Sequence, residues 1–131
     1  MPIPSRIFAC VGSVVHAIDQ QTGTIVWETS IAAGRIQMMA HQDRVYVACE
    51  TGSLEILNAD TGALLKKVPI SGRGHAATLL IEDEMVFVSC GGELTALDLN
   101  GTRIWTNTFK GKGNGTLSLA TTQHDRQAGE Y

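Results

Sequence analysis

Short apolar segments separated by turn-forming residues run along the whole chain and predict an all-β protein. Runs of about four to six residues recur about every ten residues and are bounded by Gly, Asn and Asp. In the central part of the chain the predicted strands are 36–40, 45–49, 54–58 and 64–68, with turns at 42–43, 51–52 and 60–62. In the part that follows they are 76–81, 85–90, 94–98 and 103–106, with turns at 82–83, 91–92 and 100–101. No segment shows a convincing helical period.

Three of these segments are apolar at nearly every position, which indicates strands that are covered on both faces. They are 7–11, 45–49 and 85–88. A strand with one face in water would alternate apolar and polar residues instead. Each of these strands therefore needs a packed layer on either side.

The segments belong to a unit of about 40 residues that runs about three times, a period typical of propeller blades and solenoids. The copies align at 17–23 with Val26-Trp27, at 56–62 with Leu65-Lys66, and at 96–101 with Ile104-Trp105. In a propeller every blade lies between two neighbours, which supplies the double burial. The sequence therefore predicts a β-propeller of four-stranded blades, with three blade-equivalents in the chain.

The first copy of the unit resembles the tryptophan-docking motif of the PQQ-like repeat family, the quinoprotein alcohol dehydrogenase-like β-propellers. The residues that carry the resemblance are Ala17, Asp19, Gly23 and Trp27. The third copy repeats it, one residue shorter, with Asp98, Gly101 and Trp105, whereas the second has Asn58 and Lys66 at the Asp and Trp positions. The family includes PQQ-dependent alcohol dehydrogenases and a non-enzymatic outer-membrane β-barrel assembly scaffold. The resemblance implies that the Trp side chains pack between adjacent blades, in a turn fixed by Asp and Gly.

The repeat is out of phase with the ends of the chain. Residues 6–33 correspond to strands two to four of a first blade, 34–73 and 74–112 to whole blades, 113–123 to a first strand, and 124–131 to a flexible tail. Two chains joined head to tail would form a closed ring of six blades, in which 113–123 of each chain completes the first blade of the other. The alternative is that the chain is a fragment of a longer propeller. The expected partner is thus a second copy, with a protein or peptide ligand in addition.

Composition and charge narrow the function classes. The 131 residues are 44% hydrophobic and 18% charged, which indicates one folded domain. The net charge is −3 and the basic residues are scattered, so we expect no nucleic-acid partner. The N-terminal segment has neither a signal-peptide core nor a membrane span, so we expect a cytoplasmic protein without a membrane partner. Cys10, Cys49 and Cys90 form no CxxC or Cys/His pattern, and Cys49 and Cys90, which fall at equivalent positions of the repeat, are interpreted as buried thiols.

One set of polar residues is a candidate binding site. Arg35, His75 and Asn114 open the first strand of successive units, near the expected axial channel, where they could hold an anion or a peptide carboxylate. The simpler interpretation is that they are solvated loop residues. No catalytic, cofactor-binding or metal-binding residue is assigned, because the aspartates lie at turns and calcium needs six to eight oxygen ligands. The cofactor that the resemblance implies is PQQ, but the sequence offers no set of residues to bind it.

The predicted function is therefore a non-catalytic β-propeller that acts as an interaction scaffold for an unknown partner. The alternative is a small-molecule binding protein or enzyme that holds a quinone-type cofactor or an anion in the central channel of the assembled propeller.

Overall fold

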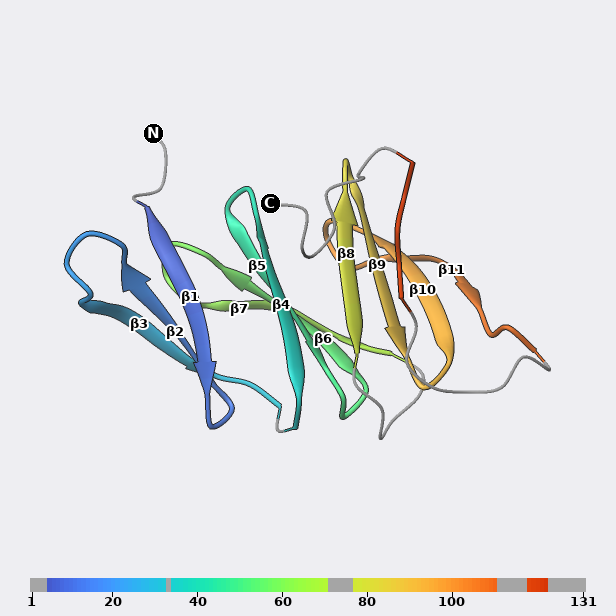
Figure 1. Ribbon diagram of the computed structural model, residues 1–131, viewed down its shortest axis with the longest axis horizontal. Coiled ribbons are helices and arrows are strands. Elements are labelled where there is room, and N and C mark those ends of the chain that lie inside the picture. Colours follow the sequence, from blue (N-terminus) through green and yellow to red (C-terminus); the bar gives the residue numbers. More distant parts are fainter. Residues whose placement is uncertain (1–4, 33, 71–76, 111–117, 123–131) are drawn as a thin grey trace.

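The computed structural model describes residues 5–32, 34–70, 77–110 and 118–122 and contains three antiparallel sheets that lie side by side along its long axis (Figure 1). The first sheet has the order β1 (Arg6–Val11), β2 (Val14–Asp19), β3 (Ile25–Ser30). The middle sheet has the order β4 (Ile36–His41), β5 (Arg44–Cys49), β6 (Ser53–Asn58), β7 (Leu64–Pro69). The third sheet has the order β8 (Thr78–Glu82), β9 (Met85–Cys90), β10 (Glu93–Asp98), β11 (Arg103–Asn107). The predicted all-β fold class is confirmed.

The strands predicted within residues 7–106 are observed, with ends that differ by one or two residues, and β8 differs most. The first strand predicted at 113–123 lies partly outside the described residues, and its described part, 118–122, is in no strand. The sequence predicted a strand over 76–81 and a turn at 82–83, whereas β8 spans Thr78–Glu82. Glu82 pairs with Met85 across the hairpin, so the turn consists of Asp83 and Glu84. Asp83 has a φ of 54°, close to the 57° of Gln42 in the corresponding turn of the middle sheet. The position of this turn is therefore set by the pairing of β8 with β9, and not by which residues favour turns.

The three sheets share one hydrogen-bonding register. Ala17 pairs with Phe8 on one side and Trp27 on the other, and Ala96 pairs in the same way with Phe87 and Trp105. A register shift typical of a β-bulge follows Ala17, Ile56 and Ala96, at the same place in each sheet. Residues in the three sheets can therefore be matched position by position.

The core lies in two layers, one on each face of the middle sheet. Val45, Val47 and Cys49 of β5 pack against the first sheet, and Tyr46 and Ala48 pack against the third. All five are at most 1% exposed, which confirms that the continuous apolar strand is covered on both faces. The middle sheet therefore shows how a sheet packs when each of its faces has a neighbouring sheet.

The Cys49 thiol is expected to be unreactive in the folded protein. Burial raises its pKa from 9.0 to about 11, so the nucleophilic thiolate is scarce at neutral pH. Labelling with a thiol reagent at pH 8, followed by peptide mapping, should leave Cys49 unmodified until urea is added. The pKa of Cys49 is higher in the folded than in the unfolded chain. The buried thiol therefore contributes its full share to the free energy of unfolding below pH 9, and this share is lost as the pH rises through about 11. Rapid labelling of native Cys49 would contradict this burial.

Candidate functional site

The turns that follow β2, β6 and β10 are built alike, and each is held by the side chain of its first residue. The Asp19 carboxylate accepts hydrogen bonds from the backbone N–H groups of Gln21 and Thr22 at 2.8 and 3.0 Å. These two bonds lower the pKa of Asp19. The side-chain oxygens of Asn58 and Asp98 each accept two backbone N–H groups in the same way. Asn replaces Asp here because the turn needs an acceptor oxygen, which both residues have.

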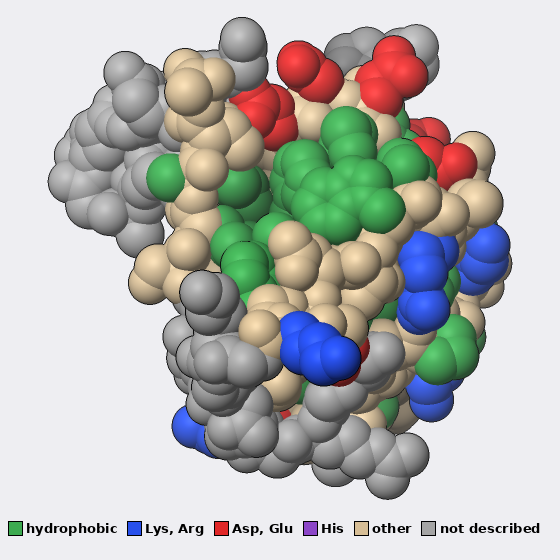
Figure 2. Space-filling view, turned by 90° about the vertical axis from the view of Figure 1, so that its right-hand side faces the viewer, with side chains coloured by type: hydrophobic (Ala, Val, Ile, Leu, Met, Phe, Trp, Pro, Cys, Tyr) green, Lys and Arg blue, Asp and Glu red, His purple; other side chains and the backbone are tan. Residues whose placement is uncertain are grey.

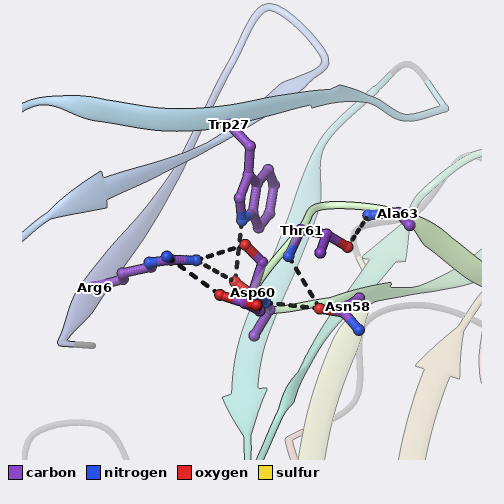
Figure 3. A network of polar contacts seen from close by, with 7 residues as sticks. Arg6, Trp27, Asn58, Asp60, Thr61 and Ala63 are labelled. Carbon is purple, nitrogen blue, oxygen red and sulfur yellow. Dashed lines mark hydrogen bonds and ion pairs between the residues drawn. The ribbon is translucent and has the colours of Figure 1, made fainter. Parts of the chain in front are cut away.

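The turn after β6 receives two side chains of the first sheet (Figure 3). The Trp27 indole N–H donates to the carbonyl oxygen of Ala59 at 3.0 Å. The Arg6 guanidinium donates to the same oxygen at 3.1 Å and to the Asp60 carbonyl oxygen at 2.7 Å, and it pairs with the Asp60 carboxylate at 3.3 Å. A single turn of the middle sheet thus holds both edges of the first sheet.

Gly62 completes this turn and lies directly beneath the indole. Its φ is 82°, a conformation that glycine adopts without strain. A Cβ atom at this position would lie 2.6 Å from the Trp27 ring. The Gly62 carbonyl oxygen also accepts a hydrogen bond from the Thr29 hydroxyl at 2.6 Å. Glycine is therefore required both for the turn and for the close approach of Trp27.

The turn after β10 receives an arginine of the middle sheet in the same way, together with Tyr46. The Arg44 guanidinium donates to the carbonyl oxygen of Leu99 and to the side-chain oxygen of Asn100, both at 2.8 Å. The Tyr46 hydroxyl, whose pKa is raised by burial, donates to the Leu99 carbonyl at 2.9 Å. Lys66 stands where Trp27 stands in the first sheet, and its Cδ approaches the Cβ position of Gly101 to 3.3 Å.

The sequence did not identify Arg6, Arg44 and Tyr46 as contact residues. Arg6 and Arg44 occupy the same register position, because they pair with Asp19 and Asn58, the first residues of the equivalent turns. The available signal was an Arg immediately before the apolar strand in two copies of the repeat. Met85 occupies this position in the third copy and pairs with Asp98.

The two end sheets expose the faces that are buried elsewhere. Ile7 and Val11 of β1 are 56% and 68% exposed, whereas the equivalent Val45, Val86, Cys49 and Cys90 are at most 1% exposed. A hollow of about 470 Å³ opens on this side of the first sheet, and its lining includes Val11, His16 and Ile18. No described atom lies within 4 Å of the Cβ position of Gly23, the equivalent of Gly62.

The opposite end of the molecule, formed by the third sheet, presents an apolar surface (Figure 2). Hydrophobic side chains gather near the centre of this view, with acidic side chains at the upper edge and basic ones to the right. Trp105 is 42% exposed and lies against Phe87, with ring centroids 6.2 Å apart. In the first sheet the equivalent rings of Phe8 and Trp27 are 5.8 Å apart.

Of the predicted channel-mouth residues, the structure describes Arg35, whereas His75 and Asn114 lie outside the described residues. The Arg35 backbone N–H and its guanidinium Nε donate to the two carboxylate oxygens of Glu50, each at 3.0 Å. These bonds lower the pKa of Glu50. An anion at Arg35 would have to compete with this carboxylate, and the assignment of the three residues as a binding site stays a prediction.

Among the residues that the structure describes, no group of three or more His, Cys, Asp or Glu side chains is arranged to hold a metal ion. The same residues include no helix with the length and apolar character needed to cross a membrane.

The fold is shared with known β-propeller proteins. BamB from Moraxella catarrhalis aligns over 78% of this chain and 32% of its own, with 24% identity and a TM-score of 0.64. The quinohemoprotein alcohol dehydrogenase from Comamonas testosteroni aligns over 79% of this chain and 19% of its own, with 22% identity and a TM-score of 0.64. Apo AztD from Citrobacter koseri aligns over 79% and 31%, with 12% identity and a TM-score of 0.66. At these identities the likeness establishes the fold alone, and the chain spans a third or less of each of these proteins.

The sequence itself also identifies the family. No curated protein sequence matches the chain. Residues 11–127 match the family model described as outer membrane protein assembly factor BamB. This match confirms the predicted resemblance to the PQQ-like repeat family, and the chain belongs to this family of β-propeller repeats.

Proposed function

We propose that the chain is a non-catalytic interaction scaffold, two copies of which close a six-bladed propeller. The observation that carries the proposal is the exposed face of the first sheet, where Ile7 and Val11 lie open although their equivalents in the other sheets are buried. Exposed apolar surface of this kind is typical of a face that a partner covers, which supports an interface here. The first and third sheets would each gain the neighbour that the middle sheet already has on both sides.

Strand exchange would complete the first sheet. This sheet has three strands, and no described strand pairs with the outer edge of β1. Residues 118–122 belong to no sheet among those described, and they fall within the segment 113–123 that repeats the first strand of the unit. We propose that this segment of each copy adds to β1 of the other, which would remove the open edge. The whole blades would then be 34–73 and 74–112.

The polar residues of the repeat support a scaffold in preference to an enzyme. Asp19, Asn58 and Asp98 are engaged in holding turns, and Arg6 and Arg44 are engaged in joining sheets. These side chains are thus occupied in holding the turns and joining the sheets. The alternative, a quinone-type cofactor or an anion in the central channel, predicts an absorbing, calcium-dependent species when PQQ is added. A scaffold is expected to leave the PQQ spectrum unchanged.

Mass in solution tests the two-chain ring. We expect the full chain to have a native mass of about 28 kDa, twice the 14.0 kDa of one chain. Ile7→Lys should shift the mass to that of one chain with the fold intact, because Ile7 is already exposed and a charge would be buried only in the ring. Leu65→Lys is the matched control, since Leu65 lies on the outer strand of the middle sheet. A wild-type chain that stays monomeric would overturn the ring.

A further inference from the structure

We propose that the two copies meet through the same contact that joins the first and middle sheets. Trp105 of one copy lies over Gly23 of the other, and its indole N–H donates to the carbonyl oxygen of Gln20. This inference rests on the proposed two-chain scaffold and specifies its contact surface. The contact occurs twice in the ring, once at each junction between copies.

The donor side is matched position by position within the chain. Trp27 and Trp105 both pair with an alanine on the neighbouring strand, immediately before the bulge. Each lies against a phenylalanine on the strand two places earlier in the same sheet, with ring centroids 5.8 Å apart for Phe8 and 6.2 Å apart for Phe87. The difference is that Trp27 meets the middle sheet, whereas Trp105 is 42% exposed. Trp105 is thus presented in the arrangement of Trp27, at a sheet with an uncovered face.

The receiving side is an equally close repeat. Gly23 has a φ of 77° and Gly62 a φ of 82°, and both close turns whose first residue holds two backbone N–H groups. Gln20 follows Asp19 as Ala59 follows Asn58, so its carbonyl takes the place of the acceptor that Trp27 uses. A Cβ at Gly62 would collide with an indole, whereas the Cβ position of Gly23 is open among the described residues. The turn at Gly23 therefore has the same form as the turn that binds Trp27, but no indole of the described residues lies against it.

The surface beside this turn also has the character of an internal junction. Ile7 pairs with the residue after the bulge, as do Val45 and Val86, which are fully buried where sheets meet. His16 matches Glu55, whose carboxylate accepts the backbone N–H of Ala32 in the connection between the first and middle sheets. A second copy brings the residues that directly follow β11, 108–110, to His16.

The repeat identifies the occupant as a second copy of this chain. Both halves of the contact are present on one chain, at opposite ends of the row of sheets in Figure 1. One end carries the Trp and the other carries the Gly turn, so a head-to-tail pair satisfies both at once. Met85 replaces the arginine that helps to hold the two internal junctions. Trp105 is therefore expected to carry a larger share of the contact between copies than Trp27 carries within one.

Sedimentation of single variants tests the contact. Trp105→Ala should raise the dissociation constant of the dimer by about 100-fold, because each dimer loses two buried indoles. Trp105→Phe keeps a ring but loses the N–H donor, and about a ten-fold increase is expected. Gly23→Ala should weaken the dimer by at least about ten-fold, since its methyl group occupies the indole site.

Two variants serve as controls. Ile104→Ala should leave the dissociation constant within about two-fold of wild type, because Ile104, Val26 and Leu65 are exposed on the outer strand of all three sheets. Gly12→Ala should do the same, since Gly12 has a φ of 58° with open space around it, at the opposite end of β2 from Gly23. Near-ultraviolet circular dichroism checks that every variant is folded.

A mixing experiment separates this contact from the ring itself. A Trp105→Ala chain and a Gly23→Ala chain each form a dimer with two defective contacts, whereas a mixed dimer regains one intact contact. Native mass spectrometry should therefore show mixed dimers above the statistical share of one half. A statistical mixture, or a wild-type dimer that is insensitive to Trp105→Ala, would overturn the contact and leave the two-chain ring standing. A monomeric wild-type chain would instead overturn the ring.

Discussion

Replacing Trp27 with Ala is expected to lower the free energy of unfolding by about 3 kcal/mol, as for other large aromatic residues in protein interiors. The variant loses the packing of the indole on the cluster between the first and middle sheets, which includes Val45 and Leu57. It also loses the ring contact with Phe8 and the hydrogen bond to the Ala59 carbonyl. A loss of this size is a large part of the stability of a small domain. Urea denaturation of the purified variant provides the measurement.

Trp27→Phe separates packing from hydrogen bonding. The Ala59 carbonyl still accepts a hydrogen bond from Arg6 when the indole N–H is removed, so this acceptor is not left without a partner. We expect Trp27→Phe to cost about 1 kcal/mol, the net value of one hydrogen bond. If Trp27→Ala were no more harmful than Trp27→Phe, the indole would not be what joins the first two sheets.

The strands and the packing of the middle sheet could be predicted because they depend on local pattern. The segment 85–90 was predicted from its apolar residues and is observed as β9. The register of β8 could not be predicted in the same way, because Glu82 is a plausible turn residue by composition and enters the strand through its pairing with Met85. Pairing between strands is a tertiary preference that overrides the weak local one.

The junction between sheets was predictable in part. The repeated motif indicated Trp27, Asp19 and Gly23, since their spacing within one copy is local. Arg6 could not be assigned, because its acceptors at Ala59 and Asp60 lie more than 50 positions away in the sequence. The space around two equivalent glycines could not be predicted either, because it depends on tertiary structure. Gly62 lies against a neighbouring sheet, whereas Gly23 has none among the described residues.

Gly62→Ala is the second substitution with a large expected effect, a loss of about 3 kcal/mol. About 1 kcal/mol comes from holding an L-residue at a φ of 82°. The remainder comes from overpacking, because the new methyl group would lie 2.6 Å from two atoms of the Trp27 ring and 2.8 Å from the Thr29 hydroxyl oxygen. The indole is planar and held between Phe8 and the middle sheet, so it cannot yield as the end of a flexible side chain would.

Gly23→Ala is the matched control, because it imposes the same backbone strain without the collision. Its φ is 77°, and its Cβ position is open among the described residues. Both glycines should be compared in the Ile7→Lys background, in which we expect the chain to be monomeric and only contacts within one copy to count. Gly23→Ala should then cost about 1 kcal/mol, about a third of the loss at Gly62. Equal losses at the two positions would show that backbone strain accounts for both and that Trp27 does not press on Gly62. A difference of about 2 kcal/mol would measure how tightly the first sheet is held against the middle one.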